Sequence, residues 1–251
     1  MTKLSSLSVI IPTLNEERYI CEVLSNVRCE LGEDTQIIVV DGGSRDRTIA
    51  NAGTATLILE GAAGRGKQMN LGAAHASGDV LLFLHADTQL PPSYRSELVA
   101  ALSNSSVIAG YSPICFDHPG FMLRLYSRMS RLTFRLFHYG DGAVFVRRAA
   151  FQRIGRYREI PLFEDLDLLS RLRRTGNIVL LSSPVQTSAR RFLQRGVVVN
   201  QLTNVLLVML YIMGLSPHVL SRWYSPPGAE SGRAGSKSAN PAISSSIPEK
   251  G

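Results

Sequence analysis

Residues 83–92, FLHADTQLPP, place a histidine and an aspartate two positions apart where an apolar run ends. Carboxylate oxygen is a good ligand for Mg²⁺ and Mn²⁺, and imidazole suits softer divalent ions, so His85 and Asp87 can bind a metal ion. Asp87 equally suits a turn at the end of a strand. This structural interpretation is favoured when the motif is taken alone.

Similar polar motifs follow other apolar runs. QIIVV at 36–40 precedes Asp41 and two glycines. Asp41 can accept hydrogen bonds from a ligand that the glycines let approach, or it can cap a helix that begins near Arg45; alone, the cap is favoured. GRGK at 64–67 combines flexible backbone with two cations and suits a phosphate. Because it lacks the spacing of the GxxxxGK[ST] and GxGxxG loops, triphosphate hydrolysis and dinucleotide binding are disfavoured.

Glu164 and Asp165 form a carboxylate pair at the expected start of a helix, EDLDLLSRLRRTG at 164–176. The helix dipole favours ionised carboxylates there, which is a purely structural explanation. The functional alternative is that one of the two takes a proton from a nucleophile, as a general base does. Asp167 is expected to point elsewhere on the helix, and Gly176 to end it.

The elements that must position these residues alternate between strand and helix. Four apolar runs, at 7–11, 36–40, 55–59 and 79–84, are predicted to be strands buried on both faces. Between the first two, apolar residues recur with helical spacing at Ile20, Val23, Leu24, Val27 and Leu31. We expect Asn15 to cap this helix, with Glu16 and Glu17 in its first turn. This alternation predicts a mostly parallel sheet whose strand ends bring the polar motifs to one edge.

The pattern changes after Gly110. A basic helix is predicted over 118–140, where Arg124, Arg128, Arg131 and Arg135 have helical spacing. Two interpretations stay open, namely a core helix with one solvated face and a face that meets phosphates or lipid headgroups. GAVFVRR at 142–148 predicts a further strand.

Segment 197–215 is the candidate for membrane insertion. Its uninterrupted apolar part runs from Val205 to Met213, well short of the roughly 18 to 20 residues that a spanning helix needs. A helix that lies on a membrane surface is still allowed. We therefore expect a folded domain over 5–195, an apolar helical segment over 196–224, and a disordered tail rich in Ser, Pro and Gly over 225–251.

Charge and cysteine content narrow the functional class. The 251 residues include 27 Lys and Arg against 20 Asp and Glu, a net charge of +7, which favours anionic lipid, nucleic acid or phosphorylated small molecules as partners. Cys21, Cys29 and Cys115 form neither a CxxC pair nor an even disulfide set, so reduced thiols in a cytoplasmic protein are expected. The opening segment, MTKLSSLSVII, is predicted to be a strand and not a signal peptide.

Six motifs resemble, in order and spacing, the family 2 glycosyltransferases with the GT-A fold: VIIPTLNEERYI, VVDGGSRDRT, GRGKQMNLGA, LLFLHADT, GDGAVFVRR and FEDLDLLSRLRR. The resemblance covers residues 7–195. It implies an α/β fold, with a GT-A-type, Rossmann-like, mostly parallel sheet flanked by helices. With HADT in place of the common DxD, the chain resembles a short bacterial subgroup of this family.

The implied activity is the inverting transfer of one sugar from a nucleoside diphosphate sugar, expected to be a UDP-sugar. The implied acceptor is a hydroxylated molecule that can be lipid-like. Nucleic acid is not an expected partner. The expected location is the cytoplasm, including contact with anionic lipid at the inner face of the cell membrane.

The resemblance also implies roles for individual residues. Asp41 would bind the base, and the other implied nucleotide-sugar contacts are Pro12, Thr13, Asn15, Glu16, Gly66, Lys67, Ala86, Arg190 and Arg191. Asp87, with His85 beside it, would hold a divalent cation, Mn²⁺ or Mg²⁺, that bridges the two phosphates. Asp165, with Glu164 next to it, would act as the general base.

Two departures from the family pattern matter. His85 replaces the first carboxylate of DxD, which favours Mn²⁺ if the imidazole binds the metal, but His85 can instead contact a phosphate. SARRF at 188–192 replaces the QxxRW of processive members, and Phe192 offers only an aromatic face while Ser188 lacks the reach of glutamine. This predicts transfer of a single sugar. Arg190 and Arg191 either help to hold the pyrophosphate or are ordinary surface arginines.

Two other functions compete with sugar transfer. A sugar nucleotidyltransferase predicts a glycine-rich loop directly after the first strand, and IIPTLNEE at 10–17 contains no glycine. A peripheral membrane module that kept the fold and lost the chemistry would use the basic helix and segment 197–215 as anchors.

Overall fold

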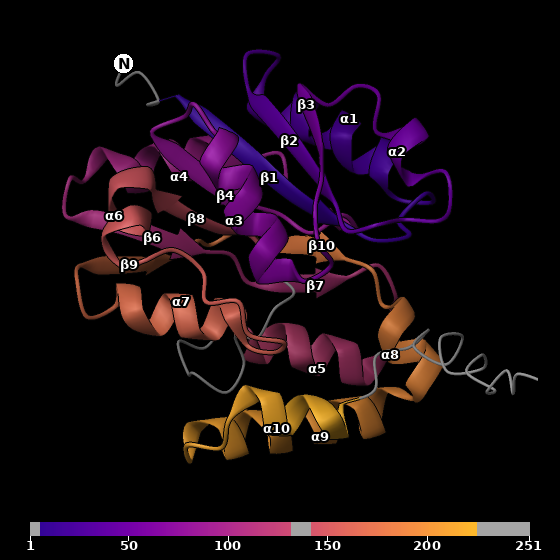
Figure 1. The fold of residues 1–251 in the computed structure, drawn as a ribbon. Helices are drawn as coiled ribbons and strands as arrows, with labels where there is room; N and C mark the ends of the chain where they lie inside the picture. Colours follow the sequence, from indigo (N-terminus) through magenta and orange to yellow (C-terminus); the bar gives the residue numbers. More distant parts are fainter. Residues whose placement is uncertain (1–5, 132–141, 225–251) are drawn as a thin grey trace, which may run out of the picture.

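The computed structural model describes residues 6–131 and 142–224 (Figure 1). The predicted tail at 225–251 lies outside the described residues. So does the later part of the predicted basic helix, which carries Arg135.

A seven-stranded sheet forms the centre of the fold. Its strands, in sheet order, are β3 (Leu57–Glu60), β2 (Gln36–Asp41), β1 (Leu7–Thr13), β4 (Val80–Phe83), β8 (Val144–Arg147), β6 (Val107–Tyr111) and β9 (Asn177–Leu180). The first four are parallel, β6 and β9 are parallel to each other, and β8 runs antiparallel to both neighbours. The predicted mostly parallel sheet is confirmed, and the carboxyl ends of β1, β2 and β4 lie at one edge.

Helices cover both faces of this sheet and form a further layer below it (Figure 1). The described helices are α1 (Ile20–Leu31), α2 (Thr48–Asn51), α3 (Arg65–His75), α4 (Tyr94–Ser103), α5 (Phe121–Met129), α6 (Arg148–Arg153), α7 (Glu164–Leu172), α8 (Arg190–Arg195), α9 (Val197–Ile212) and α10 (Pro217–Trp223). Helices α5, α9 and α10 lie in the lower layer.

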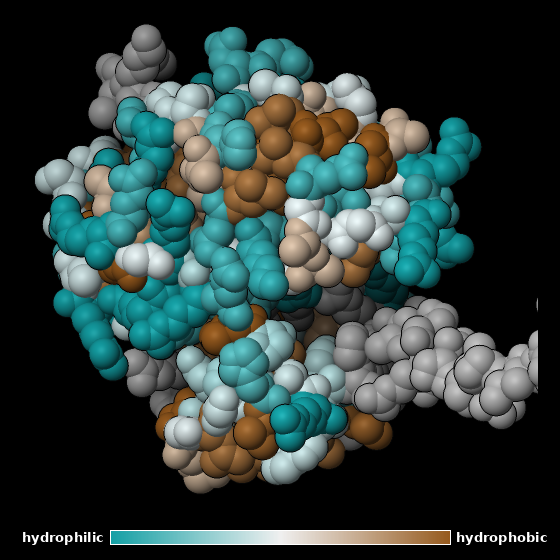
Figure 2. Space-filling view, viewed as in Figure 1, coloured by the Kyte–Doolittle hydropathy of each residue, from teal (hydrophilic) through white to brown (hydrophobic). Residues whose placement is uncertain are grey.

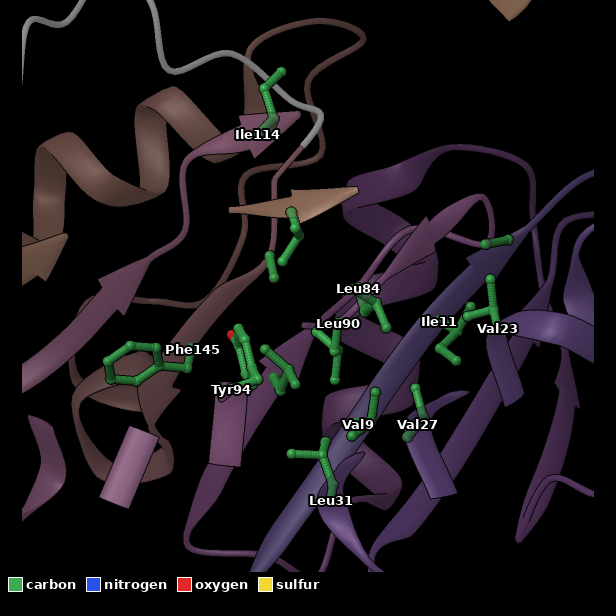
Figure 3. Packing of buried hydrophobic residues seen from close by; sticks show 14 of the residues in the cluster. Val9, Ile11, Val23, Val27, Leu31, Leu84, Leu90, Tyr94, Ile114 and Phe145 are labelled. Carbon is green, nitrogen blue, oxygen red and sulfur yellow. The ribbon is translucent and has the colours of Figure 1, made fainter. Parts of the chain in front are cut away.

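The core divides into two apolar clusters, one on each face of the sheet. Alternate side chains of β1 point to opposite faces, as the strand period requires. Val9 and Ile11 pack against Val23 and Val27 of α1 (Figure 3). Ile10 points to the other face, where α3, α6 and α7 supply the cluster. The run at 7–11 is therefore buried on both faces, as predicted.

The prediction for 55–59 is wrong in one respect. The strand there is β3, and its residues Leu57, Ile58 and Leu59 are only half-buried. The reason is topological, because β3 is the edge strand of the sheet and pairs with β2 alone. Apolar composition predicts a strand but does not reveal its position in the sheet.

A small second sheet joins distant parts of the chain. It consists of β5 (Thr88–Gln89), β10 (Val185–Thr187) and β7 (Ile114–Phe116), with β10 in the middle. Thr187 pairs with Thr88, immediately after Asp87. This sheet therefore fixes the chain that leads into α8 beside the HADT loop.

The lower helical layer contains α5 and the C-terminal helices. Helix α5 buries Leu123 and Tyr126 and exposes Arg124 and Arg128, so the described part of the predicted basic helix has both a packed and a solvated face. Among residues 6–131 and 142–224, no helix has the length and apolar character needed to cross a bilayer.

Candidate active site

The loops that follow β1 and β2 are bound to each other. The backbone N–H of Asn15 donates to Oγ of Ser44 (2.8 Å), and the N–H of Arg45 donates to Oδ1 of Asn15 (2.9 Å). The N–H of Glu16 donates to Oγ1 of Thr48 (2.7 Å). These bonds close the loops over the strand ends.

Asn15 is not the helix cap that its sequence position predicts. Helix α1 begins at Ile20, and the carbonyl of Glu16 accepts from the N–H groups of Tyr19 and Ile20. Asn15 has φ of 56°, a left-handed conformation that asparagine tolerates. Its side chain instead accepts a hydrogen bond from the loop after β2, and this long-range contact outweighs the local preference for capping.

Asp41 is buried at the end of β2 and organises the turn after it. Its Oδ2 accepts from the N–H groups of Gly43 (2.9 Å) and Ser44 (2.7 Å), and its Oδ1 accepts from Oγ1 of Thr13 (3.1 Å). The turn role is therefore present, and base binding stays a prediction. The following helix, α2, begins at Thr48, later than expected, with Asp46 accepting from its N–H (2.9 Å).

A charged cluster joins three distant segments at this edge of the sheet. Nη2 of Arg190, the first residue of α8, donates to Oε2 of Glu16 (2.6 Å) and to Oδ2 of Asp87 (3.1 Å). The side chain of Arg190 is 25% exposed, and those of both carboxylates are 10% exposed. Its guanidinium also lies over the ring of Tyr19, 4.6 Å from the centroid. Arg190 is therefore not an ordinary surface arginine.

Arg190 keeps its positive charge at the centre of the cluster. Burial opposes the charged form of Arg190, but its hydrogen bonds to Glu16 and the charges of Glu16 and Asp87 outweigh this effect and raise its pKa. The backbone holds the cluster in place, because the N–H of Ser188 donates to the carbonyl of Asp87 (3.2 Å). An arginine fixed in this way can attract phosphate oxygens as well as carboxylates.

The predicted carboxylate pair lies at the N-terminus of α7, and both side chains are nearly buried. Glu164 forms an ion pair with Arg65 of α3 (3.5 Å). Oδ1 of Asp165 accepts a hydrogen bond from the hydroxyl of Tyr157 (2.7 Å), and its Oδ2 lies 3.9 Å from Nε2 of His85. The two residues of the pair therefore face different partners.

Tyr157 stays protonated in this environment. Burial, followed by the charge of Asp165 and the hydrogen bond to it, raises the pKa of Tyr157 well above its usual value. A neutral phenol at this position donates to the Asp165 carboxylate. It fixes one oxygen and leaves Oδ2 as the oxygen on the His85 side.

Asp167 points to other partners than the Glu164 and Asp165 pair does, as predicted. It forms ion pairs with Arg158 (3.1 Å) and, one turn later on α7, with Arg171 (2.7 Å). These pairs hold the chain before α7 against the helix.

The GRGK motif opens α3 near the same edge. Lys67 is exposed, while Gly66 is buried where a Cβ would lie 2.8 Å from the carbonyl oxygen of Arg158. Gly66 thus allows α3 to approach the segment before α7. Gln68, which the motif analysis missed, donates to the carbonyls of Thr13 and Val40 (both 2.8 Å). A polar residue on the buried face of an amphipathic helix was the available signal.

The remaining predicted residues are less central. Pro12 is within β1, and Ala86 is buried between His85 and Asp87. The side chain of Arg191 lies outside the described part of the structure. Phe192 does not offer its ring to a ligand as expected. It is buried in the core, with its ring centroid 5.0 Å from that of Phe116.

The acidic and histidine residues fit a metal ion only if a ligand shares it. Among the described residues, no group of three or more His, Cys, Asp or Glu side chains is arranged to hold a metal. Mg²⁺ and Mn²⁺ can bind one protein carboxylate together with substrate phosphates and waters. Asp87, which pairs with Arg190 in the charged cluster, suits such a shared ion, and His85 lies in the same loop.

Comparison with known proteins identifies the family. Residues 8–157 match the model of "Glycosyl transferase family 2". An undecaprenyl-phosphate 4-deoxy-4-formamido-L-arabinose transferase from Enterobacter sp. (strain 638) is 30% identical over 125 residues, which cover 44% of this chain and 38% of that protein.

Two solved structures have the same fold. S. aureus TarS in complex with UDP-GlcNAc has a TM-score of 0.59 at 20% identity, covering 73% of this chain and 58% of that chain. The mannosyltransferase PcManGT from Pyrobaculum calidifontis, in complex with GDP-Man and Mn²⁺, has a TM-score of 0.59 at 21% identity, covering 88% and 69%. The predicted GT-A fold is confirmed. Because the family model matches more than half of its residues, the chain belongs to glycosyl transferase family 2.

Proposed function

We propose that the chain transfers one sugar, with inversion, from a nucleoside diphosphate sugar to a hydroxyl acceptor, and that Asp165 is the general base. The observation that carries this proposal is the position of the Asp165 carboxylate. It is held at Oδ1 by Tyr157, and its Oδ2 faces His85 of the loop that also carries Asp87. In this proposal the base therefore lies next to the loop after β4, which carries the residue proposed to hold the metal ion.

The reaction needs one proton transfer and one displacement. The acceptor oxygen attacks the anomeric carbon while its proton passes to Oδ2 of Asp165. The bond between the anomeric carbon and the diphosphate oxygen breaks, and the diphosphate leaves with the electron pair. Attack opposite to the leaving group inverts the anomeric centre.

The leaving diphosphate would lie toward the Glu16, Asp87 and Arg190 cluster. Arg190 supplies a fixed positive charge there. Asp87, with His85 as the second candidate ligand, would hold a divalent cation. When bound, that cation neutralises charge developing on the phosphates. Asn15 and Asp41 would line the nucleotide side of the pocket, where the two loops are bound together.

The relatives support the substrate classes. TarS and PcManGT were solved with UDP-GlcNAc and GDP-Man, the latter with Mn²⁺. The chain spans only 38% of the length of the undecaprenyl-phosphate transferase that it matches. The lipid in the name of that relative nevertheless supports a lipid-like acceptor for this chain. A UDP-sugar stays the expected donor.

A donor screen with and without Mn²⁺ tests the proposed function. The wild-type chain should show a rise in thermal stability, and slow release of free sugar, with at least one nucleoside diphosphate sugar in the presence of Mn²⁺. The Asp87→Asn variant should lose the Mn²⁺-dependent part of both signals, because an amide is a weaker ligand for a hard cation.

The matched control is Asp79→Asn, an exposed aspartate at the opposite end of β4 whose side chain is paired with Arg148. This variant should behave like the wild type. Absence of both donor binding and hydrolysis across UDP-, GDP-, ADP- and dTDP-sugars would overturn the proposal. An unchanged Mn²⁺ response in Asp87→Asn would overturn the assignment of the metal ligand.

Tyr157→Phe is expected to lower kcat by about tenfold and to leave the KM for the donor unchanged, because the loss of one hydrogen bond releases Asp165 from its orientation. The ring would still pack against Phe83 (4.9 Å) and Phe151 (5.7 Å), so the fold should survive. Steady-state kinetics that separate kcat from KM provide the test.

Tyr94→Phe is the control, because Tyr94 is also fully buried but belongs to the other core cluster. Equal loss of kcat in the two variants would show that the effect is a general one of buried tyrosines, and would remove the positioning role of Tyr157.

A further inference from the structure

Helix α9 carries a continuous apolar stripe on its outer side. The stripe consists of Val199, Leu202, Leu206 and Met209 of α9 and of Met213, the residue directly after the helix, and all are between 48% and 67% exposed. Their spacing of three, four, three and four residues places them on one face of the helix. Large apolar side chains rarely line up in this way on a surface that faces only water.

The stripe belongs to a larger apolar region. Figure 2 shows hydrophobic residues gathered on the lowest part of the molecule, where Figure 1 places α9 and α10. Trp223 at the end of α10 is 63% exposed, and Phe121 at the start of α5 is 78% exposed. Both helices pack against α9.

Every charged residue in these helices is positive. Between Asp167 and Glu230 the sequence contains no acidic residue, and there is none between Asp117 and Asp141. Helix α5 carries Arg124 and Arg128, both exposed, and α10 carries Arg222, also exposed. An apolar stripe on helices whose charged residues are all positive matches the two requirements for binding to an anionic lipid surface.

A second copy of the chain fits this surface less well. In a two-fold symmetric contact the same patch meets itself. The arginines of one copy would then face those of the other, and their like charges would repel. A spanning arrangement is also disfavoured, because α9 has 16 residues and the described helices include none able to cross a bilayer. A helix lying in the plane of the membrane would bury the apolar stripe and leave the arginines of the neighbouring helices free to meet anionic headgroups.

The layer is joined directly to the site. Helix α8 begins at Arg190 and leads through Gly196 into α9. On the other side, the ring of Phe163, which precedes Glu164, stacks on the ring of Tyr211 of α9, with centroids 5.1 Å apart. The charged cluster is therefore connected to this layer through α8, and the carboxylate pair is connected to it through the contact of Phe163 with Tyr211.

We propose that the α9 stripe, with α10 and α5 beside it, docks on an anionic membrane and holds the site at the bilayer surface. The docking does not depend on sugar transfer. The further idea that docking brings the site to a lipid-borne acceptor rests on the proposed function.

Flotation of the full chain with vesicles tests the docking. The wild type should float with vesicles made of equal parts phosphatidylcholine and phosphatidylglycerol, and much less with phosphatidylcholine alone. Leu202→Gln/Leu206→Gln/Met209→Gln should reduce the bound fraction at least about tenfold, since three apolar side chains are lost from the contact. Arg124→Glu/Arg128→Glu should also reduce binding. The matched control, Arg153→Glu/Arg174→Glu, changes exposed arginines elsewhere and should bind like the wild type apart from a small general charge effect.

Trp223 allows the same test without any mutation, because it is the single tryptophan of the chain. Its emission should shift to the blue on anionic vesicles, and brominated lipids should quench it. Failure of the wild type to float or to shift would overturn the proposal, as would equal loss of binding in the two arginine variants. Donor hydrolysis measured without vesicles reports on the proposed function separately, so the two can fail independently.

Discussion

Asp165→Asn is expected to lower kcat for sugar transfer by about three orders of magnitude, within the range that general-base catalysis supplies. The amide has nearly the same shape as the carboxylate but cannot take the acceptor proton. Tyr157 can still donate to the amide oxygen, so the local fold should be kept. Donor affinity should change little, because the proposed mechanism uses Asp165 for the acceptor proton and not for binding the nucleotide. Steady-state kinetics and donor binding by calorimetry measure the two quantities.

Two neighbours on α7 provide controls for this variant. Asp167→Asn breaks the pairs with Arg158 and Arg171 and should lower thermal stability while kcat stays within a few-fold of the wild type. Glu164→Gln weakens the pair with Arg65 and should also retain most of kcat. If Glu164→Gln removes activity and Asp165→Asn does not, the base is Glu164 and the assignment proposed above is wrong.

Arg190→Gln is expected to lower the free energy of unfolding by about 3 kcal/mol, the cost of leaving a buried charge without its partner. Both Glu16 and Asp87 would lose the cation, and both side chains are only 10% exposed. For a chain of this size the loss corresponds to a fall in Tm of roughly 10 °C. Affinity for the donor diphosphate should fall about tenfold, because a charged hydrogen bond is removed. Thermal melts and calorimetric titration measure the two effects.

A double-mutant cycle separates this cluster from a general effect of losing a surface charge. In the Arg190→Gln background, Asp87→Asn removes one of the two carboxylates that had paired with Arg190 and should restore part of the lost stability. Arg190→Lys keeps the charge but not the planar guanidinium, so intermediate stability is expected. Strictly additive effects of the Arg190 and Asp87 substitutions would show that the two residues are not coupled. The charged cluster would then not be part of the proposed site.

The sequence predicts the strands and the polar residues at their ends because both depend on local patterns. Apolar runs of strand length and the residues that follow them can be identified without knowing the topology. The partners of those residues cannot be identified without the topology. Arg190 is 174 positions from Glu16 and 103 from Asp87, and the placement of β10 between β5 and β7 helps to bring them together.

The wrong predictions have the same origin. Asn15 has the residue type of a cap, but its side chain is used by the loop after β2. Phe192 has the residue type of a ligand-facing aromatic, but α8 turns it into the core against Phe116. Tyr157 carries no local signal, because its hydroxyl becomes important only through its contact with Asp165. In each case a long-range contact decides the role of a side chain whose local preference is different or absent.

The second sheet also sets a lower limit on how short a working version of this protein can be. The segment that matches the family model ends at residue 157. A chain cut there would lack β9 and β10, so β6 would lose a hydrogen-bonded neighbour and β5 and β7 would lose the strand between them. It would also lack Asp165 and Arg190. The stretch that identifies the family is therefore shorter than the stretch that completes both sheets, and a fragment that keeps both sheets and the charged cluster must extend into α8.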